Sequence, residues 1–121
     1  MKTGQLEIIN MTAVNTAKDL MGDRFPKMIE YFLEDTQMYM EEIKRGLTEQ
    51  DLQTILISAH TIKSSAKQLG ADRLSDIALQ LESLCNEMVD TNNPDFLALE
   101  GLNEKLKNEI ILATPELNKF C

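Results

Sequence analysis

The stretch DLQTILISAHTIKSSAKQLGADRLSDIALQLE, from Asp51 to Glu82, decides how this chain folds. On a helix that turns by about 100° per residue, its first half forms one apolar stripe. The stripe consists of Leu52, Ile55, Leu56, Ala59, Ile62, Ala66 and Leu69. His60, the single histidine of the chain, lies off this stripe on a polar face. Its neighbours there are Lys63, Ser64, Ser65 and Lys67. The pattern predicts a helix that buries one side and presents an imidazole to water on the other.

The same 3/4 spacing of apolar residues recurs along the rest of the chain and predicts further helices. The expected helices cover residues 11–21, 23–45, 49–69, 72–89 and 94–113. Gly46 is interpreted as the end of the second helix, and Pro115 as the end of the fifth, with a frayed tail beyond it. Asn93 is expected to cap the fifth helix, with Pro94 in its first position. The sequence therefore predicts an all-α fold: one domain over residues 1–121, an up-down-up-down four-helix bundle with an additional short N-terminal helix across it.

Composition limits the possible partners. Apolar residues make up 43% of the chain and aromatic residues 5%, which predicts an aliphatic core. The net charge of −8 argues against binding to nucleic acid or to an anionic membrane, because both require a basic surface. No apolar run is long enough to span a membrane or, near the N-terminus, to form a signal peptide. The two cysteines, Cys85 and Cys121, do not form a disulfide framework, so a cytoplasmic location is expected.

Few side chains in this sequence could carry chemistry. A di-iron bundle needs Glu-x-x-His pairs, but Ile57 stands where that glutamate would be, so no metal site is expected. The dispersed glycines form no phosphate-binding loop. Cys85 falls on the apolar stripe of its helix and is interpreted as a buried residue rather than a nucleophile. His60 remains, with two lysines that could neutralise oxyanions beside it. Ile57, apolar on a polar face, indicates either a contact surface or a position under the first helix.

The residues around His60 resemble a known family. Ala59-His60, Lys63, Ser65, Gly70 and Leu74 match the pattern of histidine-containing phosphotransfer (HPt) domains, H-x-x-K-G-[SA]-x-x-x-x-G followed by a leucine-rich helix. The resemblance extends over essentially the whole chain, since the helix lengths also fit. One departure is Ser64, at a position where the family most often has glycine. We expect the serine to leave room for a partner and to allow a hydrogen bond to a phosphoryl group.

The resemblance implies a phosphorelay intermediate. His60 would accept a phosphoryl group from the aspartyl phosphate of a response-regulator receiver domain and pass it to another receiver. Lys63 would neutralise the phosphoryl charge, with help from Lys67. Glu82 would orient the ring, as a glutamine or glutamate on the facing helix often does in the family. A histidine kinase or hybrid kinase would supply the phosphate. No cofactor is implied, because Mg²⁺ would come with the receiver.

The resemblance also implies a docking surface around His60, formed by the first helix and the upper parts of the second and third. Its candidate residues are Ile57, Ser64, Ser65, Lys67, Leu69 and Gly70, together with Met21 and Phe25. A surface that admits a receiver favours a monomer, and the complete bundle beginning at Met1 favours a free-standing protein. Two other hypotheses stay open: a non-catalytic acidic helical adaptor, and an enzyme that hydrolyses a substrate of its own.

Overall fold

The computed structural model describes residues 6–121, so the first five residues of the predicted domain lie outside it. Its elements are α1 (Met11–Met21), η2 (Gly22–Arg24), α2 (Phe25–Glu49), α3 (Leu52–Gln68), α4 (Asp72–Thr91) and α5 (Phe96–Asn118). The short turn η2 joins α1 to α2. None of the described helices is both long and apolar enough to cross a membrane.

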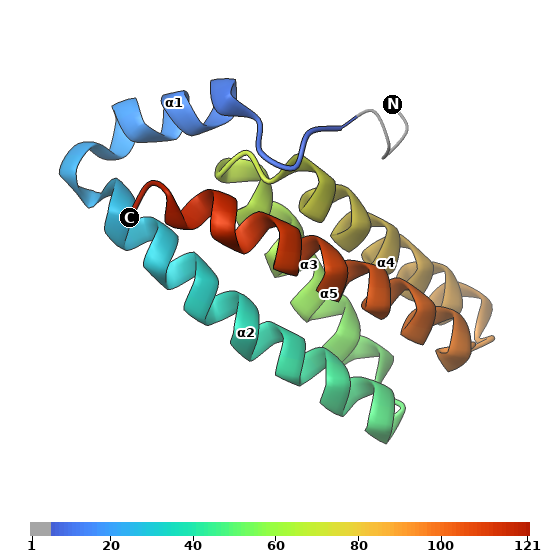
Figure 1. Ribbon diagram of the computed structural model, residues 1–121. Coiled ribbons are helices and arrows are strands. Elements are labelled where there is room, and N and C mark those ends of the chain that lie inside the picture. Colours follow the sequence, from blue (N-terminus) through green and yellow to red (C-terminus); the bar gives the residue numbers. More distant parts are fainter. Residues whose placement is uncertain (1–5) are drawn as a thin grey trace.

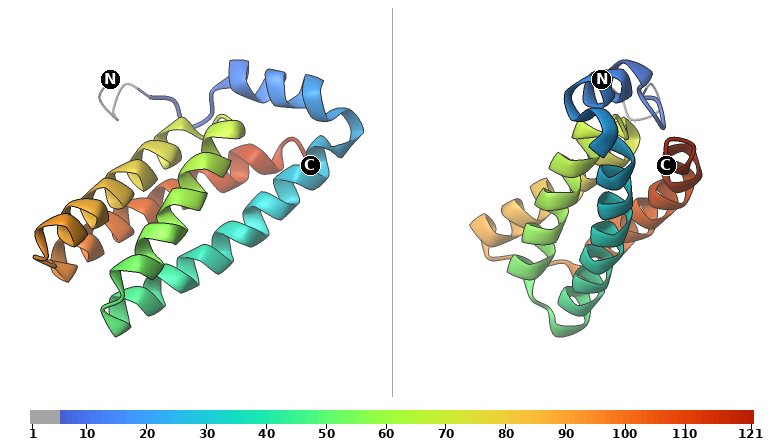
Figure 2. Two further views of the ribbon diagram at one scale, coloured as in Figure 1. Left: turned by 180° about the vertical axis from the view of Figure 1, so that it is seen from behind. Right: turned by 90° about the vertical axis from the view of Figure 1, so that its left-hand side faces the viewer.

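Helices α2 to α5 form an up-down-up-down bundle, which confirms the predicted fold (Figure 1). Helix α3 packs against α2 and α4, and α5 closes the bundle by packing against α4 and α2. Helix α1 lies across one end of the bundle, beside the turn between α3 and α4, as both views of Figure 2 also show. The additional N-terminal helix is therefore present and packs as predicted.

The core is almost entirely aliphatic, as the composition predicted. Its largest fully buried side chains are Val14, Ile29, Ile43, Ile55, Ile62, Leu69, Leu74, Leu81, Cys85, Leu99, Leu106 and Leu117. Helix α1 contributes little to this core, since only Val14 and Ala17 of its side chains are buried. Leu20 is 80% exposed although it follows the apolar spacing of α1. Helix α1 is thus attached by a narrow strip and leaves apolar surface open at the end of the bundle.

Gly46 does not end α2, contrary to the prediction. The helix continues to Glu49, and Gln50 ends it in the left-handed conformation, with φ of 58°. Gly46 is buried because α2 and α3 approach each other there: a Cβ at this position would lie 2.7 Å from Cγ1 of Ile55. Helix α3 then begins at Leu52 rather than at residue 49, since the side chain of Asp51 caps it by accepting a hydrogen bond from the Thr54 amide at 3.2 Å.

The predictions for both ends of α5 were also wrong. Asp95, not Asn93, caps the helix, its carboxylate accepting from the Ala98 amide at 3.1 Å. At the other end the helix passes through Pro115 to Asn118. The proline ring lies on the exposed side, where the carbonyl of the preceding turn can bond to water. The tail is not frayed, because the Phe120 ring packs edge-on against Phe25, with ring centroids 6.2 Å apart.

The turn between α3 and α4 is fastened to the lead into α1. Gly70 has φ of 78°, and its carbonyl accepts a hydrogen bond from the Asn10 amide at 2.7 Å. Asn10 also caps α1 through its side-chain oxygen and donates from Nδ2 to Asp72 at 3.0 Å. A single asparagine therefore joins α1 to the end of the helix that carries His60.

Replacing Gly70 by alanine is expected to destabilise the protein by about 1–3 kcal/mol, because the residue would be strained at positive φ. Its Cβ would also lie 2.6 Å from the carbonyl oxygen of Asn10. Urea unfolding followed by circular dichroism measures the effect. The matched control is Gly101→Ala in α5, where a Cβ has no neighbour within 4 Å. That variant should be neutral or more stable by up to about 1 kcal/mol, and equal losses in the two variants would contradict the explanation.

Candidate functional site

His60 lies at the middle of α3 with 57% of its side chain exposed. Its Nδ1 is hydrogen-bonded to Oε2 of Glu82, which comes from the facing helix α4. The other oxygen of the same carboxylate, Oε1, accepts a hydrogen bond from Nζ of Lys63 at 2.7 Å. Glu82 therefore connects the imidazole and the ammonium group that stands one turn further along α3.

Glu82 itself is buried, with 8% of the residue exposed. Burial acts to raise the pKa of its carboxyl, but the hydrogen bonds and positive charge of Lys63, together with the hydrogen bond from His60, outweigh it and lower the pKa below its usual 4.5. The carboxylate is therefore ionised near neutral pH. An ionised carboxylate can only accept hydrogen bonds, so the proton between it and His60 belongs to Nδ1.

The lowered pKa predicts a pH dependence of stability. Because the folded-state pKa lies below the unfolded value, the ionised carboxylate stabilises the fold above pH ~4.5, and this stabilisation is lost as the pH falls through the folded-state pKa. Glu82→Gln is expected to cost about 1–2 kcal/mol near pH 7, with the difference from wild type shrinking towards pH 3. Urea unfolding between pH 3 and 7 measures this difference in the free energy of unfolding. Glu41→Gln, at an exposed position of α2, is the control and should follow the wild-type pH profile.

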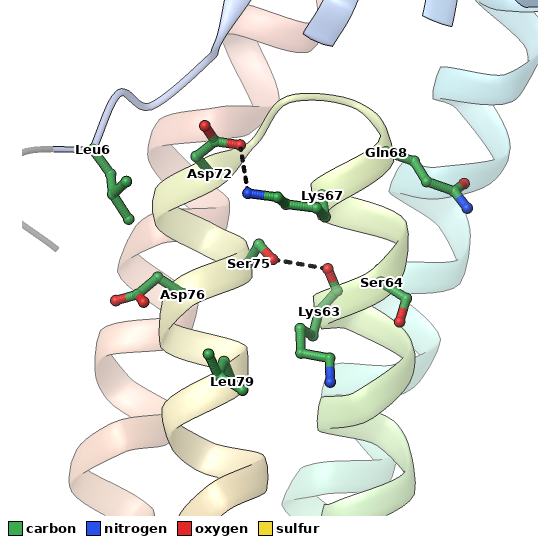
Figure 3. A pocket seen from close by; sticks show the side chains of 9 residues that line it. All are labelled: Leu6, Lys63, Ser64, Lys67, Gln68, Asp72, Ser75, Asp76 and Leu79. Carbon is green, nitrogen blue, oxygen red and sulfur yellow. Dashed lines mark hydrogen bonds and ion pairs between the residues drawn. The ribbon is translucent and has the colours of Figure 1, made fainter. Parts of the chain in front are cut away.

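A cleft of about 640 Å³ opens between α3 and α4 beside this site (Figure 3). Lys67 reaches across it towards Asp72, with 4.0 Å between Nζ and Oδ1, and stays 72% exposed. Further down the cleft the hydroxyl of Ser75 donates to the backbone carbonyl of Lys63 at 2.9 Å. These two contacts join α3 and α4 on the C-terminal side of His60.

The structure separates the two serines that follow Lys63. Ser64 is exposed, one turn beyond His60 on the same face of α3. Ser65 is half-buried and faces α2, where it lines a small cavity with Tyr31 and Asp35. Ile57, one turn before His60, is 52% exposed. Of the two readings of Ile57, the structure supports the surface position and not burial under α1.

Three residues expected on the docking surface are inside the protein. Leu69 is 1% exposed and Phe25 2%, since both side chains fill the core where α1, α2 and α3 meet. Gly70 is also buried, and its function is to form the turn that holds Asn10. Met21 is half-buried at the edge of an apolar groove of about 450 Å³ between α1, α2 and α3. The docking surface therefore excludes Leu69, Phe25 and Gly70.

Two features of this end of the bundle are not indicated by the sequence. Leu20 follows the apolar spacing of α1 but lies at the rim of the apolar groove, and Met28 lines the α2 side of that groove. Asn10 caps α1, and no pattern in the sequence indicates that it also binds Gly70 and Asp72. The Asn10 contacts join segments about 60 residues apart, and the groove forms only where α1, α2 and α3 meet, so local periodicity reveals neither.

Two other kinds of site were considered in the sequence: a cysteine nucleophile and a metal site. Cys85 is fully buried, and burial raises its pKa to about 11, so it remains a thiol and packs as the small apolar residue that was predicted. Within residues 6–121, no group of three or more histidine, cysteine or acidic side chains is arranged to hold a metal ion. The site thus consists of an exposed imidazole, a buried carboxylate hydrogen-bonded to it, and nearby lysines, on the surface of a four-helix bundle. Such a site presents a reactive group to another protein instead of enclosing a small substrate.

Comparison with known proteins gives the family. A model of the Hpt domain family matches residues 27–111, which include His60 and Glu82. The phosphorelay protein LuxU of Vibrio cholerae is 30% identical to this chain over 104 residues, covering 84% of this chain and 88% of the relative. LuxU of Vibrio vulnificus is 25% identical over 83 residues, or 68% of this chain and 72% of the relative. The chain belongs to the Hpt domain family and has the histidine phosphotransfer function of that family in two-component phosphorelays.

A solved structure has the same fold. Histidine-containing phosphotransfer protein B from Pseudomonas aeruginosa superposes with a TM-score of 0.84, covering 93% of this chain and 92% of that chain. Its sequence identity of 17% means that this likeness establishes the fold alone. Proteins of the Hpt family work with receiver domains and kinases and, as a family, carry no cofactor.

Proposed function

We propose that His60 is the residue that carries the phosphoryl group in this protein. It accepts the group from the aspartyl phosphate of a response-regulator receiver domain and passes it to another receiver. The observation that carries this proposal is the hydrogen bond between Nδ1 of His60 and the buried carboxylate of Glu82, on an imidazole that is otherwise open to solvent. No other histidine occurs in the sequence.

Glu82 supports this role by fixing the tautomer of the ring. Because the carboxylate holds the proton on Nδ1, the lone pair of the neutral imidazole is on Nε2. Nε2 attacks the phosphorus of the aspartyl phosphate: the N–P bond forms as the P–O bond to the aspartyl oxygen breaks, and the electron pair leaves on the receiver's carboxylate. The reverse sequence delivers the group to a second receiver. Such transfer depends mainly on positioning and on charge.

Lys63 supports the reaction by neutralising Glu82 and not by direct contact with the phosphoryl group. Its ammonium is bonded to Glu82, so the buried carboxylate beside His60 is neutralised before a phosphoryl group arrives. Without Lys63, that carboxylate would repel the phosphoryl oxygens. Lys67, which is largely exposed and 4.0 Å from Asp72, provides a second positive charge on the same side of α3.

The partners are receiver domains and the histidine kinase or hybrid kinase that feeds them, and Mg²⁺ comes with the receiver. The docking surface surrounds His60 and consists of Ile57 and Ser64 on α3 and the apolar groove lined by Leu20, Met21 and Met28. An apolar centre with charged residues at its edge is the ordinary composition of a transient interface. A monomeric state and a cytoplasmic location complete the proposal.

A transfer assay tests this function. The protein is mixed with a receiver domain carrying ³²P-labelled aspartyl phosphate and with Mg²⁺, and label on this chain is tested for stability. A phosphohistidine is labile in acid and stable in alkali, and tryptic mapping should place it on the peptide that contains His60. Label with the opposite stability, or none from several receivers with a protein shown to be helical, would favour the acidic adaptor instead.

A further inference from the structure

Ser64 lies on the proposed docking surface one turn from His60, but the transfer step described above gives its hydroxyl no part in the chemistry. Its side chain is exposed, and its hydroxyl has no hydrogen-bond partner among residues 6–121. Five threonine hydroxyls donate to the carbonyl four residues earlier, those of Thr16, Thr48, Thr61, Thr91 and Thr114. The Ser64 hydroxyl makes no such bond to the carbonyl of His60, so it is free to donate elsewhere.

The position of Ser64 on α3 indicates which acceptor its hydroxyl can reach. Residues three and four places apart on a helix are neighbours, so Lys63 and Ser64 flank His60 on the next turn. Side chains on a helix tilt towards its N-terminus, and Figure 3 shows the Ser64 hydroxyl directed away from Lys67 and Gln68, towards the N-terminal part of α3. This direction leads towards the preceding turn of α3, and His60 lies on that turn four residues earlier.

The hydrogen bond to Glu82 determines which ring nitrogen of His60 is left for the phosphoryl group. Glu82 binds Nδ1 from the side of α4, and Lys63 binds the same carboxylate from that side. Nε2 is the ring nitrogen that makes no bond to Glu82, so a phosphoryl group on His60 would be attached there, one turn from Ser64. The ammonium of Lys63 is already bonded to Glu82, whereas the Ser64 hydroxyl has no competing acceptor.

We propose that Ser64 donates a hydrogen bond to a phosphoryl oxygen of phosphorylated His60 and so acts as a positioning residue that prolongs the life of the phosphohistidine. This inference rests on the proposed function of His60. Hydrolysis of the N–P bond passes through a loose, metaphosphate-like transition state. Negative charge on the phosphoryl oxygens is higher in the ground state than in that transition state, so a donor that binds these oxygens slows the loss of phosphate. Charge-assisted hydrogen bonds are the stronger kind.

The test needs no partner protein. Phosphoramidate phosphorylates the intact chain directly: Nε2 attacks phosphorus, the N–P bond to His60 forms, and the P–N bond of the reagent breaks with release of ammonia. After removal of the reagent, the decay of phosphohistidine is followed by ³¹P NMR. Ser64→Ala is expected to shorten the half-life by roughly threefold to tenfold and to shift the ³¹P resonance. Ser65→Ala is the matched control, since it removes the neighbouring hydroxyl that faces α2, and it should behave as wild type.

The outcomes separate the two proposals. Equal half-lives for wild type and Ser64→Ala would overturn the hydrogen bond and leave the function of His60 intact. Equal shortening in Ser64→Ala and Ser65→Ala would also overturn it, because the cause would then be a general loss of order in α3. A wild-type protein that takes no alkali-stable phosphate from phosphoramidate, while remaining helical, would instead overturn the role of His60.

Discussion

Replacing His60 by glutamine is expected to abolish phosphorylation of this protein while leaving the fold intact. The side chain is 57% exposed and contributes nothing to the core, so its loss removes little packing. The glutamine amide can still donate to Glu82, which keeps that buried carboxylate bonded. We therefore expect a change of less than about 1 kcal/mol in the free energy of unfolding. The amide has no nucleophilic lone pair to replace Nε2, and the sequence contains no second histidine.

Two measurements on the same sample check this prediction. Circular dichroism and urea unfolding report whether the variant is folded, and transfer from a ³²P-labelled receiver domain reports phosphorylation. We expect label to fall below detection, a loss of at least about a thousandfold. Acid-labile, alkali-stable label that persists on a folded His60→Gln protein would show that another residue carries the phosphoryl group.

A charge placed on the docking surface is expected to cause the second largest loss of phosphoryl transfer. Ile57 is 52% exposed, one turn from His60, and does not contribute to the core. Ile57→Asp would put a carboxylate at an apolar contact, where its desolvation by a docked receiver is unfavourable. A penalty of about 1.4–2.8 kcal/mol corresponds to a loss of about tenfold to a hundredfold in kcat/KM for transfer from a receiver. Initial rates of phosphoryl transfer, measured at several receiver concentrations, give this kcat/KM.

The chain provides a matched control for this variant. Ile111 is 67% exposed on α5, outside the surface formed by α1, α2 and α3. Ile111→Asp makes the same chemical change and the same change in net charge, and it should transfer phosphate as the wild type does. Phosphorylation of Ile57→Asp by phosphoramidate should also be unchanged, because that reaction needs no docking. Equal losses of transfer in Ile57→Asp and Ile111→Asp would place the docking surface elsewhere or point to a general charge effect.

Short-range patterns in the sequence were sufficient to predict the helices and the exposure of His60. A helix brings residues three and four apart onto one face, so the spacing of leucine, isoleucine and alanine predicts which face is buried wherever the rest of the chain supplies a partner. That condition held for α3, whose stripe from Ile55 to Leu69 lies in the core. It did not hold for Leu20, because α1 crosses the end of the bundle and has only a narrow contact with it.

At the ends of the helices, tertiary contacts outweigh the local preferences of single residues. Gly46 and Pro115 both read as stops, yet α2 and α5 continue through them. The glycine is needed because Ile55 of α3 approaches closely, and the proline is tolerated because its ring faces water. Glycine and proline have local preferences of only a few kcal/mol, which contacts with a neighbouring helix can outweigh.

The sequence by itself determined the all-α bundle, the aliphatic core and the presence of a single imidazole on a polar helix face, because each depends on the order of residues within a few turns. Only the tertiary structure decided that Glu82 bonds to both His60 and Lys63, that Leu69 and Phe25 are buried, and that Ile57 stays exposed. Those properties depend on how α1, α3 and α4 meet. A residue's burial and its charge partners are set by whichever segments pack against it, however distant these are along the chain.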